Sequence, residues 1–174
     1  MRAISLWQPW ASAITLGAKT IETRSWYTSY RGAIAIHAAK RMVKNEIIEV
    51  FAKNHHWHEV FKDLMEANVS LTNPLWKILP LGAIVAVAHL SKCIPTECVA
   101  FNDLNRVHRP IRSTCVHYKC TERDMGDFTP GRYAWILTSI VGLSHPIPLK
   151  GQQGLWSLNM DICQQIEGQL STHP

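Results

Sequence analysis

The chain has 174 residues, of which 47% are hydrophobic and 18% are charged, and its Lys and Arg exceed its Asp and Glu by 18 − 13, a net charge of +5. This length suits one domain with its own core, and this composition excludes an intrinsically disordered chain. The longest apolar run, residues 83–88, is too short to cross a bilayer, and the amino terminus has no signal-peptide pattern. We therefore expect a single domain over residues 1–174, in the cytoplasm and without a membrane partner.

The first part of the chain predicts strands separated by one short helix. Residues 3–6 form an apolar strand candidate, and Pro9 follows where the first turn of a helix accepts proline. A helix of about nine residues is expected to end at Gly17, because a left-handed closing residue favours glycine. Residues 20–26 are β-branched or aromatic with charges between them, which predicts a strand, and residues 32–38 predict another.

The rest of the chain predicts further strands with helices inserted among them. Apolar residues at helical spacing indicate helices at residues 43–51 and 57–65. Residues 80–90 are apolar on both faces and predict a central buried strand. The last two strands are predicted at residues 132–140 and 155–158. We expect an α+β fold built on a small β-barrel of about five to six strands, with inserted helices.

A long irregular excursion is predicted over residues 91–129, with one helical turn after its first proline, because periodicity there is weak. It carries four of the five cysteines at matched spacing, Cys93-x4-Cys98 and Cys115-x4-Cys120, so a zinc site is an open alternative. The spacing is wider than that of the usual CxxC zinc knuckle, and an odd number of cysteines fits reduced thiols better than disulfides. We therefore expect no metal and no cofactor.

Three ionisable groups stand close together in the stretch LGAKTIETRSW, residues 16–26. With a strand period of two, Glu22 and Arg24 share a face and are close enough to pair, which leaves guanidinium donors for a phosphate or a base edge. Lys19 is expected to lean over the same cleft as a phosphate contact or a proton carrier. The competing interpretation is an ion pair that closes the barrel, with a solvated lysine.

The string Gly17-x-Lys19-x-x-Glu22-x-Arg24, directly after the predicted helix opened by Trp7-Gln8-Pro9-Trp10, resembles the signature of the ASCH domain family, whose fold is similar to the PUA barrel. The resemblance covers nearly the whole chain, continuing through RGAIAIH (31–37), GAIVAV (82–87), GDFTPGRYAW (126–135) and PIPLKG (146–151) to Leu155-Trp156. It implies a nucleic-acid-associated domain whose motif lines a cleft and, in some relatives, a hydrolytic activity on RNA or nucleosides.

The resemblance also implies one sharp enzymatic hypothesis, because small ASCH relatives remove the acetyl group of N4-acetylcytidine. Their pattern has a lysine where Lys19 stands and an arginine where Arg24 stands. Their nucleophilic threonine aligns with Glu22, so Thr20 or Thr23 would have to substitute for it. Glu22 itself would serve as a general base on water, or would accept a hydrogen bond from the exocyclic amine of a bound base. A ribonuclease would use Lys19 and Glu22 as acid and base.

Aromatic and basic residues near the motif extend the candidate site. We predict that Trp7 and Trp26 stack on bases and that Arg31 holds the nucleic-acid backbone, with His37 as a secondary candidate. Core packing is the competing interpretation for each tryptophan and for His37.

The predicted function is therefore recognition of RNA, other single-stranded nucleic acid or a modified nucleobase by an ASCH domain. The first alternative is a hydrolase that acts on RNA or on N4-acylated cytidine, and the second is a protein-interaction module. Salt dependence separates binding from the second alternative, because phosphate contacts release counterions. Product formation identifies the hydrolase.

Overall fold

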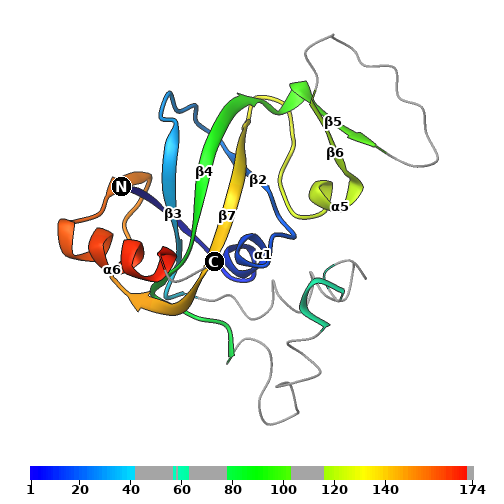
Figure 1. Ribbon diagram of the computed structural model, residues 1–174. Coiled ribbons are helices and arrows are strands. Elements are labelled where there is room, and N and C mark those ends of the chain that lie inside the picture. The colour runs from blue at the N-terminus through cyan, green and yellow to red at the C-terminus, as the bar shows by residue number, and fades with distance from the viewer. Residues whose placement is uncertain (42–56, 58, 63–77, 103–115, 172–174) are drawn as a thin grey trace. The chain divides into compact units, whose positions relative to one another are not determined.

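The computed structural model describes residues 1–41, 57, 59–62, 78–102 and 116–171 (Figure 1). The chain divides into two compact units. Unit 1 comprises Met1–Ala18, Ala33–Ala88 and Ser139–Pro174, and unit 2 comprises Lys19–Gly32 and His89–Thr138. That residues 1–174 act as one domain stays a prediction.

Within the described residues, one sheet has six strands in the order β2-β7-β4-β3-β1-β8, and β5 and β6 form a second sheet. The strands are β1 (Arg2–Leu6), β2 (Ile21–Arg24), β3 (Gly32–Ala38), β4 (Ala83–Pro95), β5 (Val99–Asn102), β6 (Val116–Lys119), β7 (Tyr133–Pro148) and β8 (Leu155–Ser157). The helices are α1 (Trp10–Thr15), the 3-10 turn η1 (Thr96–Cys98), α5 (Cys120–Arg123) and α6 (Met160–Leu170). A mixed six-stranded sheet with separate helices confirms the predicted α+β fold.

Unit 1 is built where β1 pairs in parallel with β3 and antiparallel with β8. Its core joins side chains of β1, β3, β4, β7 and β8 to those of α6, which lies against the sheet (Figure 1). Ile162 and Ile166, one helical turn apart, are the α6 side chains buried in this core. The helix starts at Asn159, whose side chain accepts a hydrogen bond of 2.9 Å from the Ile162 amide.

Helix α1 shows why Gly17 was a useful signal. The amide of Gly17 donates to the Ile14 carbonyl at 2.8 Å, and the amide of Ala18 donates to the Ala13 carbonyl at 3.0 Å. These two bonds form a Schellman motif, which needs a left-handed residue at the first position beyond the cap. Gly17 has φ +70, so the predicted end of the helix is confirmed.

Unit 2 is built where β2 pairs antiparallel with the first residues of β7. Ile21, Ala134 and Ile136 form its buried cluster, with partly buried side chains of β4, β5 and the segment before β7 around them. Strands β5 and β6 pair in parallel, and α5 follows β6 directly (Figure 1). Glu122 in α5 is 4% exposed, so this short helix has an acidic group turned away from solvent.

All six predicted strands are present in the described residues, with some shifted ends, and other features differ from prediction. Residues 91–129 are less irregular than expected, because they hold the end of β4, the predicted helical turn as η1, strands β5 and β6, and α5. Strand β7 continues to Pro148, beyond the predicted end at 140. Helix α6 was not predicted at all. The helix predicted at 43–51 lies outside the described residues; of that predicted at 57–65, residues 57 and 59–62 are helical and the rest lies outside them.

Candidate functional site

The pairing of β2 with β7 decides which side chains surround the motif. Glu22 lies opposite Trp135, and Arg24 lies opposite Tyr133. Directly opposed residues of an antiparallel pair point to the same side of the sheet. We use the name motif cluster for Lys19, Glu22, Arg24, Trp26 and Trp135, all of which belong to unit 2.

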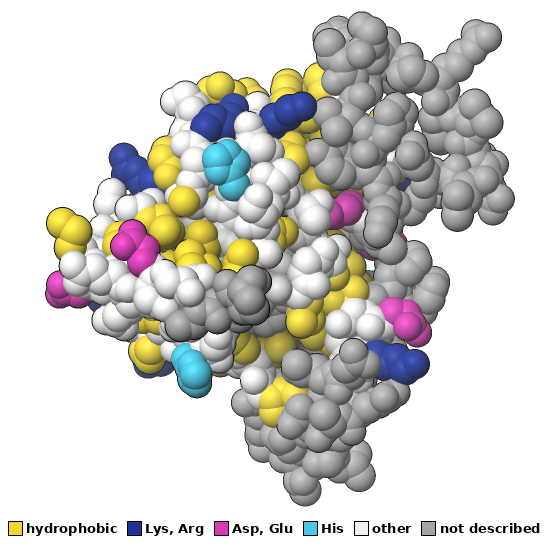
Figure 2. Space-filling model, in the orientation of Figure 1, with side chains coloured by type: hydrophobic (Ala, Val, Ile, Leu, Met, Phe, Trp, Pro, Cys, Tyr) yellow, Lys and Arg dark blue, Asp and Glu magenta, His cyan; other side chains and the backbone are white. Residues whose placement is uncertain are grey.

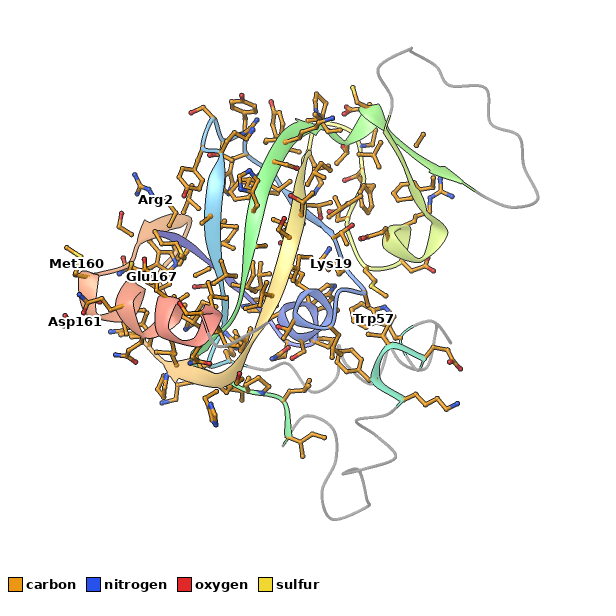
Figure 3. All side chains as sticks on the ribbon, in the orientation of Figure 1. Arg2, Lys19, Trp57, Met160, Asp161 and Glu167 are labelled. Carbon is orange, nitrogen blue, oxygen red and sulfur yellow. The ribbon has the colours of Figure 1, made fainter. Side chains whose placement is uncertain are left out.

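Lys19 is enclosed in unit 2 and does not extend into solvent. It stands two residues before the start of β2 and is 1% exposed (labelled in Figure 3). Its Nζ donates to the Ile21 carbonyl and, at 2.8 Å, to the Met125 carbonyl, and it lies 3.6 Å from Glu22 Oε2. The two carbonyls thus accept from two of the three N–H donors of the ammonium group, and Glu22 balances its charge. The geometry therefore favours a positioning role for Lys19 over direct contact with a phosphate.

Glu22 joins the buried lysine to a partly exposed arginine. Its Oε1 lies 3.1 Å from Arg24 Nε, and its side chain is 12% exposed, whereas that of Arg24 is 26% exposed. The predicted pairing of Glu22 with Arg24 on one face is confirmed. The three charges sum to +1, and Arg24 is the member through which that charge meets solvent.

Glu122 braces the start of β2, and nothing in the motif string had indicated it. Its Oε1 accepts hydrogen bonds from the amide and the hydroxyl of Thr20, both at 2.5 Å, and its Oε2 accepts from the Ile21 amide at 3.3 Å. A buried carboxylate with three donors is well compensated for the loss of water. These contacts hold the backbone directly after Lys19, and they occupy the hydroxyl of Thr20.

Aromatic rings form the other part of the motif cluster. Trp26 lies edge-on to Trp135, with ring centroids 4.7 Å apart and an interplanar angle of 89°. Trp135 is fully buried, and its Nε1 has no hydrogen-bond partner among the described residues. Tyr27 is 53% exposed and contacts Tyr133 at 5.6 Å between centroids. Trp135 was not a predicted site residue, because only the strand register places it opposite Glu22.

A second ion pair in unit 2 holds the segment that precedes β7. Arg132 Nε lies 3.2 Å from Asp127 Oδ2, and the Asp127 amide donates to Thr23 Oγ1 at 3.1 Å. Hydrogen bonds from the hydroxyl and amide of Thr129, with the nearby Arg132 charge, lower the pKa of the Asp127 carboxyl. Thr23 is 8% exposed, so its hydroxyl is part of this brace.

Arg31 is exposed in unit 2, and its Nη1 donates to the Thr28 carbonyl at 2.9 Å and to the Tyr30 carbonyl at 2.6 Å. These bonds hold its guanidinium against its own loop. On the face drawn in Figure 2, the charged side chains of the described residues are scattered and do not gather into one large patch of a single sign. The charges on this face therefore do not by themselves indicate an interface.

The two other predicted site residues, Trp7 and His37, belong to unit 1. Trp7 is 48% exposed, so its ring is accessible, as a stacking role requires. His37 is 1% exposed, and its Nε2 lies 2.9 Å from the Leu149 carbonyl, which makes Nε2 the donor. Its ring also lies edge-on to Trp156, with centroids 5.8 Å apart. His37 is thus a buried histidine that holds a neighbouring segment in place.

We expect stability to fall below about pH 6.5 because of His37. Burial lowers the pKa of His37 from 6.5, and the Leu149 carbonyl opposes this shift only in part. Because the pKa of His37 is lower in the folded chain than in the unfolded chain, protonation favours unfolding. The stability of the chain is therefore undiminished by His37 above pH 6.5, and it falls as the pH drops from 6.5 towards the pKa of the folded chain. In urea unfolding, the free energy of unfolding of His37→Gln should fall less with decreasing pH than that of the parent chain. His89→Gln, at an exposed histidine, should show the same fall as the parent chain. Equal declines in all three proteins would contradict the assignment.

The described cysteines are free thiols. Cys93 is buried, and burial raises the pKa of its thiol, against smaller opposing effects of the Thr28 backbone and the Arg31 charge. Cys98 is partly buried. Cys115 and the side chain of Cys120 lie outside what the structure describes, so the zinc alternative for the four-cysteine set stays open. Among the described side chains, no group of three or more potential metal ligands occurs.

The chain belongs to the ASCH domain family, because the model of that family matches residues 4–120. The match includes both strands that carry the Gly17 to Arg24 string and the RGAIAIH segment, so the family predicted from those motifs is confirmed. The α+β fold expected for this family agrees with the six-stranded sheet of the described residues. None of the helices in the described ranges is long and apolar enough to span a membrane.

Similar proteins include activating signal cointegrator 1 of Homo sapiens, 25% identical over 162 residues, and that of Mus musculus, 24% identical over 162 residues. Each alignment covers 92% of this chain and 23% of the relative, so the chain spans about a quarter of their length. Two crystal structures of an ASCH protein from Zymomonas mobilis are also similar, at 18% identity for one and 19% for a point variant, each with a TM-score of 0.49. They cover 96% of this chain and 93% and 96% of their own.

Proposed function

We propose that this ASCH-family chain binds single-stranded RNA, or a related single-stranded nucleic acid, through the motif cluster of unit 2. One observation carries the proposal: a partly exposed guanidinium, that of Arg24, shares a strand face with an aromatic group built on buried Trp135. Guanidinium groups bind phosphates with paired hydrogen bonds, and aromatic rings stack on bases of any sequence. An unpaired strand offers both its phosphates and its base faces.

Each residue has a defined part in this proposal. Arg24 and Arg31 contact phosphate oxygens, and Trp26 and the exposed Tyr27 stack on bases. Glu22 accepts a hydrogen bond from the exocyclic amine of a bound base, which would favour adenine, cytosine, guanine or a modified base that retains an exocyclic N–H over uracil. Lys19 acts through Glu22, since its ammonium group is enclosed by carbonyls.

Binding is favoured over hydrolysis because the two proposed catalytic groups are in contact with each other. Lys19 Nζ lies 3.6 Å from Glu22 Oε2, so each group partly neutralises the other and the lysine lies out of reach of solvent. A general acid must come within hydrogen-bond distance of the leaving group. The substitute nucleophiles are occupied as well, since Thr20 bonds Glu122 and Thr23 bonds the Asp127 amide.

The expected result of Arg24→Gln is a roughly tenfold weaker affinity for single-stranded RNA at moderate salt, because one charged hydrogen bond to phosphate is lost. The slope of log K against log salt should become shallower by about 0.7. Lys92→Gln is the matched control, because Lys92 is exposed in the same unit and carries the same charge. Fluorescence anisotropy on short RNA and DNA strands measures both quantities.

Three outcomes would redirect the proposal. Equal losses in Arg24→Gln and Lys92→Gln would mean that net charge alone governs binding. Affinity that is independent of salt would favour the protein-interaction module. Products from RNA or N4-acylated cytidine in mass spectrometry, absent with Glu22→Gln, would make the chain a hydrolase.

A further inference from the structure

Unit 1 contains a pocket of about 790 Å³ that is separate in sequence from the motif. It is lined by the end of β1, the end of β3 and the residues after it, the two residues before β4, and the segment 149–153 between β7 and β8. Backbone hydrogen bonds tie three of these parts together: the Gly82 amide donates to Ala38, and the Leu149 amide donates to Gly82. Because the lining comes from four well-connected segments of one unit, the pocket is a property of the fold of that unit.

The charge of the pocket has one sign. Lys40, Arg41 and Lys150 line it, and no Asp or Glu is among the described residues of its lining. All three cations are exposed, so their charged ends are available to a ligand from solvent. Three neighbouring cations attract an anion with more than one negative charge, and both arginine and lysine bind phosphate in proteins.

Two buried or partly buried side chains, His37 and Ser5, hold the segment 149–153 that forms one wall of the pocket. His37 binds the Leu149 carbonyl through Nε2 at 2.9 Å, and Ser5 Oγ donates to the Gln152 carbonyl at 2.9 Å. Gly151 lies flush on the histidine ring, because a Cβ added there would fall 2.4 Å from His37 Cε1. These contacts hold segment 149–153 so that Lys150 and the exposed amide side chains of Gln152 and Gln153 line the pocket.

The size of the pocket indicates a ligand larger than inorganic phosphate. Its volume lies within the range of about 300–1,000 Å³ that is usual for small-molecule sites. The lining pairs the cations with apolar surface from Leu81 and Leu149 and with the amides of Gln152 and Gln153. Amides both donate and accept hydrogen bonds, as the edge of a nucleobase requires, while leucine side chains suit the ring face.

We propose that this pocket binds a nucleoside monophosphate, with the phosphate on Lys40, Arg41 and Lys150 and the base against the amides. A free nucleotide and the phosphorylated end of a strand share this chemistry. The proposal goes beyond binding by the motif cluster, since it concerns other residues and a different unit.

Calorimetric titration of the full chain with the four ribonucleoside 5′-monophosphates and the four matching nucleosides tests the proposal. Each monophosphate that binds should do so more tightly than its nucleoside, and raising the salt concentration should weaken it. Lys150→Gln should reduce the affinity about tenfold, because a charged hydrogen bond to phosphate is lost. Lys62→Gln, at an exposed lysine of unit 1 outside the pocket lining, should bind as the parent chain does.

Short RNAs of one sequence, with and without a 5′-phosphate, separate the two sources of the ligand. Tighter binding of the phosphorylated strand that depends on Lys150 assigns the pocket to strand ends, and binding of free monophosphates alone assigns it to nucleotides. The proposal is overturned if no monophosphate and no phosphorylated strand binds, if nucleosides bind as well as monophosphates, or if Lys150→Gln and Lys62→Gln behave alike. Thermal melting of both variants confirms that they are folded.

Discussion

Methionine in place of Lys19 is expected to lower the free energy of unfolding by about 3–5 kcal/mol, the usual cost of removing one partner from a buried ion pair. The lysine is 1% exposed, so its replacement stays inside the unit. Methionine has nearly the same shape and volume as lysine, so the loss of stability is mainly electrostatic. The carbonyls of Ile21 and Met125 would lose a charged donor, and Glu22 would lose its buried cation. An unsatisfied buried acceptor costs about 1–3 kcal/mol by itself.

Urea unfolding measures this loss, and Lys92→Met is the matched control. Lys92 is an exposed lysine of the same unit, so its replacement should change stability by no more than about 0.5 kcal/mol. The double variant Lys19→Met, Glu22→Gln should be more stable than the sum of the two single losses predicts, because the second change removes a carboxylate left without its cation. If Lys19→Met lowers the free energy of unfolding by less than about 1 kcal/mol, Lys19 is not a buried structural cation, and its interpretation as a solvent-facing ligand contact is favoured instead.

The local half of the motif cluster could be predicted from the sequence because a strand has a period of two. Glu22 and Arg24 are two residues apart, so any strand through them places both on one face, and the structure has them 3.1 Å apart. Gly17 likewise predicted the end of α1, since the left-handed conformation of a closing residue depends only on local sequence. Both predictions depend only on neighbours within a few residues.

The other half of the cluster depends on partners that are far away in the sequence. Glu122 binds Thr20 across 102 residues, and Met125 accepts from Lys19 across 106 residues. No local pattern reveals these contacts, and without them Lys19 was expected to be solvated or to face a ligand. Trp135 was not predicted as a site residue for the same reason, since the register of β2 against β7 cannot be derived from either strand alone.

Helix α6 was missed for a different reason, because its local signals were present. Asn159 is a favoured N-cap residue, Asp161 follows in the first turn, and Ile162 and Ile166 are one turn apart. The short apolar stripe of only two buried residues gave a weaker period than the strands nearby. Its burial in unit 1 comes from tertiary packing, which a local pattern does not contain.

Alanine in place of Gly151 is expected to destabilise the chain by about 2–3 kcal/mol, near the upper end of the usual cost of overpacking. The added Cβ would lie 2.4 Å from His37 Cε1, 2.7 Å from His37 Nδ1 and 2.7 Å from Ser5 Oγ. No Cβ tolerates such distances, so segment 149–153 or the buried ring has to move. Movement of the segment also breaks the hydrogen bond from His37 to the Leu149 carbonyl and that from Ser5 to Gln152.

The same substitution at Gly168 gives the control, with the opposite sign. Gly168 lies in α6 with no atom within 4 Å of an added Cβ, so Gly168→Ala should stabilise the chain by about 0.5–1 kcal/mol. The double variant Gly151→Ala, His37→Ala should recover part of the packing cost, because the shortened side chain leaves room for the new methyl group. If Gly151→Ala and Gly168→Ala both raise the urea midpoint, segment 149–153 does not rest on His37, and this wall of the unit 1 pocket is not held as the distances require.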